Sequence, residues 1–521
     1  MVARSRFSFS KLAFAVAGAL ALVVGTDAAG AVLPAPPPDP PVRVIVQLWD
    51  GLDAAPRTAV ANLGGAVTGN LAVVNGFSAT LPSSAVASLA ANPGVRVVSL
   101  DAPVLTQGTM ADGGAPSVYR EVVRADAASA AGRRGAGVTV AVIDTGIAPT
   151  GPLADRLLTV DGGAQCVNLS PEPGCADSYG HGTFIAGLVN GVAPDANLLA
   201  LKLSGRDGTS DVSRLLTAID WVLVNKDRYN VKVVNLSVRT YSPLSYRTDP
   251  VNLAVERLWA AGVLVSVSAG NQGPGASSIA KPADDPWVVT TGSIDDHGTV
   301  SLADDAVSDF SSRGPSIPDG VAKPDVVVPG RSLVSLRSPG SEADLRHPYF
   351  VDATQRRGSG TSFSTGITSG AAAVLLAADP TATNDRVKFA LMSSGRAVPG
   401  ADASAAGSGV FDLEAAAGAP PGEANKQRFH PLFWPLRGPT SLTDVAGSLF
   451  EPAWWQGSNW QGSNWQGSNW QGSNWQGSNW QGSNWQGSNW QGSNWQGSNW
   501  QGSNWQGSNW QGSNWQASYW S

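Results

Sequence analysis

From about residue 118 the chain alternates short apolar runs with stretches of helical periodicity. Residues 211–224 and 249–261 carry apolar side chains at helical spacing, and both are expected to be helices. The apolar runs are expected to be strands, and they lie at 138–143, 198–203, 231–236, 263–268 and 287–291. Strands that are apolar on both faces and separated by helices form parallel sheets. The pattern therefore predicts an α/β domain at residues 118–417, with a parallel sheet covered by helices on both faces.

A shorter pattern precedes this domain, at residues 42–104. Strands are expected at 44–48, 76–81 and 95–100, and they alternate with helices at 54–63 and 83–91. This order predicts a separate small α+β domain, with its helices on one face of the sheet.

The amino-terminal 31 residues have the pattern of an export signal. Arg4, Arg6 and Lys11 precede an apolar run at 12–24, and small residues follow through residue 31. The run is too short for a bilayer core, which needs about 20 residues. We therefore expect residues 1–31 to be a signal peptide and the protein to be secreted or associated with the cell surface.

The other end of the chain is repetitive. A Pro-rich linker is expected at 419–453, and residues 456–515 are twelve copies of Gln-Gly-Ser-Asn-Trp. The segment 454–521 lacks charged residues, and its composition favours a disordered tail. Two alternatives stay open: a tail whose Trp side chains stack on cell-surface glycan, and a pentapeptide β-solenoid of about three coils.

Composition narrows the function classes. The formal net charge is -6, so no basic surface is expected for a nucleic-acid partner. The 2 Cys exclude a disulfide-scaffold miniprotein and a multi-Cys metal module. A His-Glu-x-x-His motif is absent from the sequence, which excludes the corresponding class of metallopeptidases, and we assign no metal ligands.

Three motifs carry nucleophilic chemistry. Asp144 follows the strand at 138–143 in Val-Ile-Asp-Thr-Gly, His181 opens a helix in Gly-His-Gly-Thr, and Ser362 opens another in Gly-Thr-Ser-Phe-Ser. A Ser hydroxyl is a weak nucleophile that needs a nearby base, and the base needs an acceptor that orients it. Asn271, which follows the strand at 263–268, is expected to donate to an oxyanion together with the Ser362 N–H.

Over residues 42–417 these motifs resemble those of the subtilisin-like serine peptidases. Residues 310–315 (Phe-Ser-Ser-Arg-Gly-Pro) and 323–330 (Lys-Pro-Asp-Val-Val-Val-Pro-Gly) also match segments of that family. The resemblance implies a serine endopeptidase that hydrolyses proteins or peptides through an acyl-enzyme. In it Asp144 orients His181, His181 is the general base and Ser362 attacks.

The resemblance also implies that residues 42–104 are an inhibitory propeptide, which binds its own peptidase domain and is removed by self-cleavage between 101 and 115. Catalysis would need no cofactor. Structural calcium is common in the family, but the sequence does not identify its ligands here.

The chain departs from the family pattern in two segments. Phe184 stands where the family usually has a second His, which should alter packing more than chemistry. Ser237, Val238 and Arg239 match the segment that binds substrate backbone, but the family usually has Gly where this chain continues with Val238 and Arg239. Arg239 is therefore expected to cap or narrow the substrate cleft.

Cys166 and Cys175 lie nine residues apart, between the Asp and His motifs. In an exported chain they are expected to form a loop-closing disulfide, with a pair of free thiols as the alternative. For the whole protein, the competing hypothesis is a surface- or glycan-binding protein whose peptidase domain is subordinate or inactive.

Overall fold

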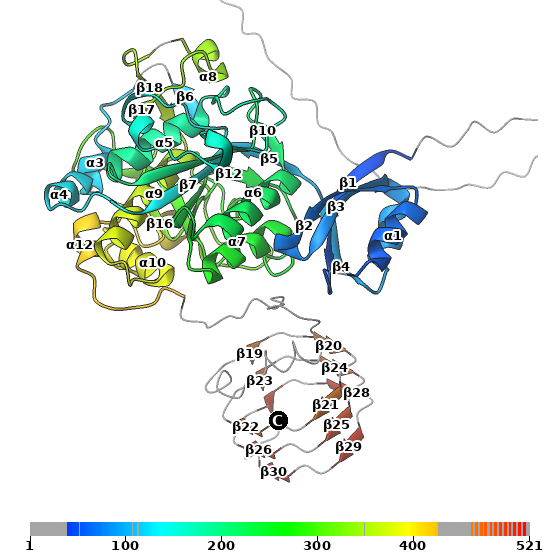
Figure 1. The fold of residues 1–521 in the computed structure, drawn as a ribbon. Coiled ribbons are helices and arrows are strands. Elements are labelled where there is room, and N and C mark those ends of the chain that lie inside the picture. Colours follow the sequence, from blue (N-terminus) through cyan, green and yellow to red (C-terminus); the bar gives the residue numbers. More distant parts are fainter. Residues whose placement is uncertain are drawn as a thin grey trace, which may run out of the picture. The chain divides into compact units, whose positions relative to one another are not determined.

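The computed structural model describes residues 39–425, apart from residues 52, 107, 112–113 and 349, together with short strands between 460 and 516 (Figure 1). The predicted signal peptide and most of the predicted linker lie outside the described residues.

The centre of the larger domain is an eight-stranded sheet in the order β15-β14-β13-β11-β7-β9-β8, with β16 pairing with β14. Its strands are β7 (Thr139–Asp144), β8 (Val167–Asn168), β9 (Asn197–Lys202), β11 (Val231–Leu236), β13 (Leu264–Ser268), β14 (Val289–Asp295), β15 (Ala306–Val307) and β16 (Val326–Pro329). The five strands expected from the sequence pair in parallel with one another.

The prediction of a purely parallel sheet is wrong at one edge, where β15 runs antiparallel to β14. Only a short loop joins these two strands, and a parallel return needs a crossover of a dozen or more residues. The sheet is therefore mixed.

Helices cover both faces of this sheet. On one face lie α6 (Val212–Asn225) and α7 (Pro250–Ala260), whose Leu215, Ile219 and Leu258 side chains share a core with the strands. Each helix begins after an Asp whose carboxylate accepts hydrogen bonds from backbone N–H groups of the first turn. The smaller helices are α3 (Tyr119–Val122), α4 (Ala125–Ala130), α8 (Glu342–Arg346), α10 (Asn384–Ser393), α11 (Ala403–Ala406) and α12 (Leu413–Ala417).

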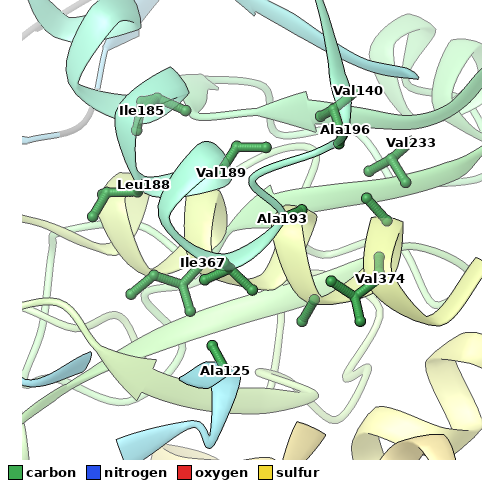
Figure 2. Close-up of a cluster of buried hydrophobic side chains, with 14 of the residues drawn as sticks. Ala125, Val140, Ile185, Leu188, Val189, Ala193, Ala196, Val233, Ile367 and Val374 are labelled. Carbon is green, nitrogen blue, oxygen red and sulfur yellow. The ribbon is translucent and has the colours of Figure 1, made fainter. Parts of the chain in front are cut away.

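The opposite face carries α5 (His181–Val192) and α9 (Thr361–Ala378), which pack directly against each other (Figure 2). Ile185 and Val189 of α5 share one buried cluster with Ile367 of α9. A Cβ added to Gly370 would lie only 2.8 Å from the Val192 Cβ, so this close approach depends on glycine. Helix α9 is long and apolar enough to span a membrane, but 89% of that stretch is buried, as in the core helix of a folded domain.

The residues at 41–100 form a four-stranded antiparallel sheet in the order β2-β3-β1-β4, with its own apolar core. Its elements are β1 (Pro41–Leu48), α1 (Ala55–Asn62), β2 (Ala66–Leu71), β3 (Gly76–Pro82), α2 (Val86–Ala90) and β4 (Val95–Leu100). The sequence pattern missed β2, because Leu71 is its one buried residue and the strand lies at the sheet edge, paired with β3 alone.

Two small antiparallel sheets join residues 103–111 to the larger domain. One has the order β10-β5-β12 and the other β17-β18-β6. Their strands are β5 (Pro103–Thr106), β6 (Thr109–Ala111), β10 (Thr209–Asp211), β12 (Val238–Thr240), β17 (Leu333–Leu336) and β18 (Gln355–Ser359).

The described strands of the tail pair in parallel with a period of 20 residues. The first are β19 (Trp460–Gln461), β20 (Asn464–Gln466), β21 (Asn469–Gln471) and β22 (Asn474–Gln476), and each heads a three-stranded sheet. Trp460 pairs with Trp480, and Trp480 with Trp500. A β-solenoid with four pentapeptides in each coil would have this period of 20 residues. Disorder of the segment remains a prediction from its composition.

Candidate active site

The three predicted catalytic residues lie on three elements of the larger domain. Asp144 is the last residue of β7, His181 is the first residue of α5, and Ser362 is the second residue of α9. Carboxyl ends of parallel strands are where open α/β sheets place their ligand sites. All three residues are buried, with at most 1% of their surface exposed.

Asp144 and His181 are in direct contact. The His181 Nδ1 lies 2.8 Å and 2.9 Å from the two carboxylate oxygens of Asp144, and the Thr145 N–H also donates to this carboxylate. An ionised carboxylate only accepts hydrogen bonds, so this contact assigns the imidazole proton to Nδ1. In that tautomer Nε2 is the nitrogen that accepts a proton.

The Ser362 segment lies beside this pair. The rings of His181 and Phe363, the residue after Ser362, have centroids 5.5 Å apart. The Ser362 hydroxyl donates to the Ser237 carbonyl at 3.1 Å, and the Ser237 hydroxyl donates to the Ser362 carbonyl at 3.0 Å. Catalytic hydrogen bonds often tighten only in the substrate complex, so this hydroxyl orientation is compatible with a nucleophile.

Asn271 contacts the residue that precedes Ser362. Its Oδ1 accepts from the Thr361 N–H at 3.0 Å and from the Thr361 hydroxyl at 2.8 Å. A backbone N–H only donates, so this contact fixes which end of the amide is oxygen. The Nδ2 group is then the end that donates, as stabilisation of an oxyanion next to Ser362 requires.

Asp177 is a residue of this site that the sequence analysis missed. Its fully buried carboxylate accepts from the Thr145 hydroxyl at 2.7 Å, the Gly180 N–H at 2.7 Å, and the N–H and hydroxyl of Thr183 at 2.8 Å and 2.6 Å. Thr145 in turn accepts from the Gly182 N–H at 2.9 Å. Asp177 therefore connects the residue after Asp144 to both sides of His181.

Burial raises the pKa of Asp177, although its hydrogen bonds oppose that shift. The only sequence signal was an Asp shortly before the predicted helix, a pattern typical of helix capping. That signal does not distinguish a cap from a residue that positions catalytic groups.

A second set of contacts supports the loop between the Asp and His motifs. Cys166 and Cys175 form a disulfide there. Glu172, inside the loop, accepts from the Ser178 hydroxyl at 2.5 Å, and this hydrogen bond is the main cause that lowers the Glu172 pKa. The buried Lys202 ammonium at the end of β9 donates to Glu172 and to the Ala176 carbonyl, at 3.3 Å and 2.7 Å. The loop is thus held to the end of the sheet.

The segment predicted to bind substrate backbone has a strand beside it. Val238 and Arg239 belong to β12, which pairs antiparallel with β5 of the same chain, and β10 pairs with the other side of β5. Phe184 is fully buried, and its ring centroid lies 4.2 Å from that of Phe363. Within the described residues, no group of three or more His, Cys, Asp or Glu side chains is arranged to hold a metal ion.

Most of the larger domain matches one known protein family. The subtilase family model matches residues 135–412. The serine protease AprX of Bacillus subtilis (strain 168) is 37% identical over 298 residues, which are 54% of this chain and 66% of AprX. Subtilisin BL of Lederbergia lenta is 32% identical over 303 residues, which are 56% of this chain and 96% of that protein.

Among solved structures, the chain resembles fervidolysin from Fervidobacterium pennivorans, described as a keratinolytic enzyme related to subtilisin. The TM-score is 0.56 at 22% identity, and the match covers 74% of this chain and 62% of fervidolysin. At that identity the likeness concerns the fold. The chain spans just under two thirds of the length of AprX and of fervidolysin.

We expect Asn271→Ala to lower kcat for peptide hydrolysis by about 10²- to 10³-fold with little change in KM, because the lost donor acts on the transition state. Steady-state kinetics on one peptide substrate would measure this. Gln272→Ala, at the exposed neighbouring residue, is the control and should retain activity. Full activity of Asn271→Ala would mean that the oxyanion donor lies elsewhere.

We expect Asp177→Asn to lower kcat about tenfold or more while KM stays nearly constant, because a displacement near 1 Å at a catalytic group is costly. The Asn side chain also turns an NH₂ group toward N–H and O–H donors whose hydrogen bonds the Asp177 carboxylate accepts in the wild-type protein. We expect the substitution to displace His181, so the pH profile of kcat should shift as well. Asp207→Asn, at an exposed carboxylate before β10, is the matched control. A loss of thermal stability with unchanged kcat would limit Asp177 to a structural role.

Proposed function

Because the chain belongs to the subtilase family of serine endopeptidases, we propose that it is an exported serine endopeptidase, made as a precursor, that cleaves proteins or peptides through an acyl-enzyme. The observation that carries the proposal is the Asp144–His181 contact beside the Ser362 segment. Asn271, with its amide oriented by Thr361, adds the oxyanion donor that this reaction needs.

In the proposed reaction the Ser362 Oγ attacks the substrate carbonyl while its proton passes to the His181 Nε2. Asp144 stabilises the imidazolium that forms, and the Asn271 Nδ2 and the Ser362 N–H donate to the oxyanion. The imidazolium then gives the proton to the leaving amine, which departs and leaves the acyl-enzyme. Water, deprotonated by His181, releases the acyl group and restores the Ser362 hydroxyl.

Labelling tests this proposal directly. A serine-directed fluorophosphonate should modify the matured wild-type protein at one site, because an activated Ser is far more nucleophilic than an ordinary hydroxyl. Ser362→Ala should remove the label. An unlabelled wild-type protein, or a label that persists in Ser362→Ala, would contradict the proposal.

We propose that the domain at 42–104 is an inhibitory propeptide, and its contacts with α6 and α7 support this. Ile45, Leu71 and Val73 lie in the same apolar cluster as residues of these two helices. Arg43 forms an ion pair with Asp211, the residue that precedes α6. It also pairs with Asp101 of its own domain. The contacts combine apolar burial with charge pairing.

The segment after this domain is held on both sides of the Ser362 region. Thr106 pairs with Val238, which follows Ser237. Thr109 pairs with Ser359, three residues before Ser362. Between them, a Cβ added to Gly108 would lie 2.7 Å from the ring of Phe363. These contacts support a path past Ser362 between Thr106 and Thr109, and we propose that the cleaved bond lies there.

Three peptide bonds join residues 106 and 109, and the middle one precedes Gly108. We expect self-cleavage at this bond, so the matured protein should begin at Gly108. Amino-terminal determination together with intact mass would measure it. Ser362→Ala in a protease-free host should retain residues 42–107. A different new amino terminus, or normal processing of Ser362→Ala, would contradict cleavage by Ser362 at this bond.

Export and the role of the tail rest on the sequence alone. The proposal includes removal of a signal peptide at 1–31. Binding of cell-surface glycan by residues 454–521 is a separate prediction from composition, and the catalytic proposal does not depend on it.

A further inference from the structure

Arg239 lies in β12, beside β5, the strand that precedes the proposed cleavage site. In the antiparallel pairing of β12 with β5, Val238 is opposite Thr106, Arg239 opposite Leu105 and Thr240 opposite Val104. Residues that are directly opposite in such a pair point to the same face of the sheet. The side chain of Arg239 therefore lies on the same face as that of Leu105.

The two faces of this strand pair differ in exposure. Val104, Val238 and Thr240 are buried, with at most 4% of their surface exposed. Leu105 and Arg239 are only partly buried. Arg239 is thus on the more exposed face of this strand pair, opposite Leu105.

The guanidinium of Arg239 lies over an aromatic ring. Its guanidinium lies 4.7 Å from the centroid of the Tyr241 ring and donates to the Tyr241 hydroxyl. Across the part of the chain that the structure describes, no carboxylate forms an ion pair with Arg239, whereas Arg228 pairs with Asp161 and Arg247 with Asp319. Stacking on Tyr241 restrains the side chain and leaves its positive charge to be matched by a ligand.

We propose that Arg239 selects peptide substrates that carry Asp or Glu three residues before the cleaved bond. This inference rests on the proposed peptidase function and on cleavage before Gly108, which makes Leu105 the third residue before that bond. An acidic side chain there is the cross-strand neighbour of Arg239, and opposite charges in this relation attract. Leu105 leaves the charge unmatched, so an acidic substrate gains a contact that the chain's own segment lacks.

The test compares two peptides that differ only by Glu or Gln at the third residue before the cleaved bond. We expect the matured wild-type enzyme to prefer the Glu peptide by roughly two- to fivefold in kcat/KM at low salt, the range for an exposed cross-strand charge pair. The preference should shrink as salt is added, because salt screens exposed charges.

Arg239→Gln should lose the preference, so that its kcat/KM values for the Glu and Gln peptides become equal. Arg228→Gln, which removes an exposed guanidinium that precedes β11 at the opposite end of the sheet, should keep it. Equal cleavage of the two peptides by the wild-type enzyme would overturn this inference and leave the peptidase function intact. Failure to cleave either peptide would contradict the peptidase function, and the inference with it.

Discussion

The geometry of the candidate site depends on the close packing of α5 against α9. His181 begins one helix and Thr361 begins the other, so the distance between the helices decides whether a base and a nucleophile meet. Gly370 allows the approach, because even a single added Cβ would press against Val192. The apolar core between the helices and the sheet then makes this arrangement rigid, since protein interiors are packed as densely as organic crystals.

Hydrogen bonds to buried carboxylates set side-chain orientations that apolar packing does not specify. Packing brings α5 and β7 together, but apolar contacts are not directional, so they do not fix the rotation of an imidazole. Asp144 orients His181 directly, and Asp177 connects the flanking backbone to Thr145. Burying the Asp177 carboxylate has a desolvation cost that raises its pKa, and the hydrogen bonds from its surroundings oppose this shift.

Two short strands that follow the small domain, β5 and β6, pair with elements near Ser362. β5 pairs with β12, which follows Ser237, and β6 pairs with β18, which ends three residues before Ser362. The ion pairs of Arg43 and the apolar contacts of Leu71 lie outside these two strands. The contacts with α6 and α7 therefore do not depend on the peptide bond that precedes Gly108.

Apolar periodicity and motif order are local properties, so the core strands, helices α6 and α7, and the motifs around Asp144, His181, Ser362 and Asn271 could be predicted from the amino-acid sequence. Tertiary contacts, which local patterns do not encode, specify the antiparallel edge strand β15, the short strands β5, β6 and β12, and the contacts of Asp177. β15 pairs with β14 across a short loop, β5 forms because the distant strands β10 and β12 pair with it, and the Asp177 carboxylate bridges Thr145 and Thr183. The position of Arg239 opposite Leu105 is likewise a matter of strand register, which shifts a side chain to the other face with a slip of one residue.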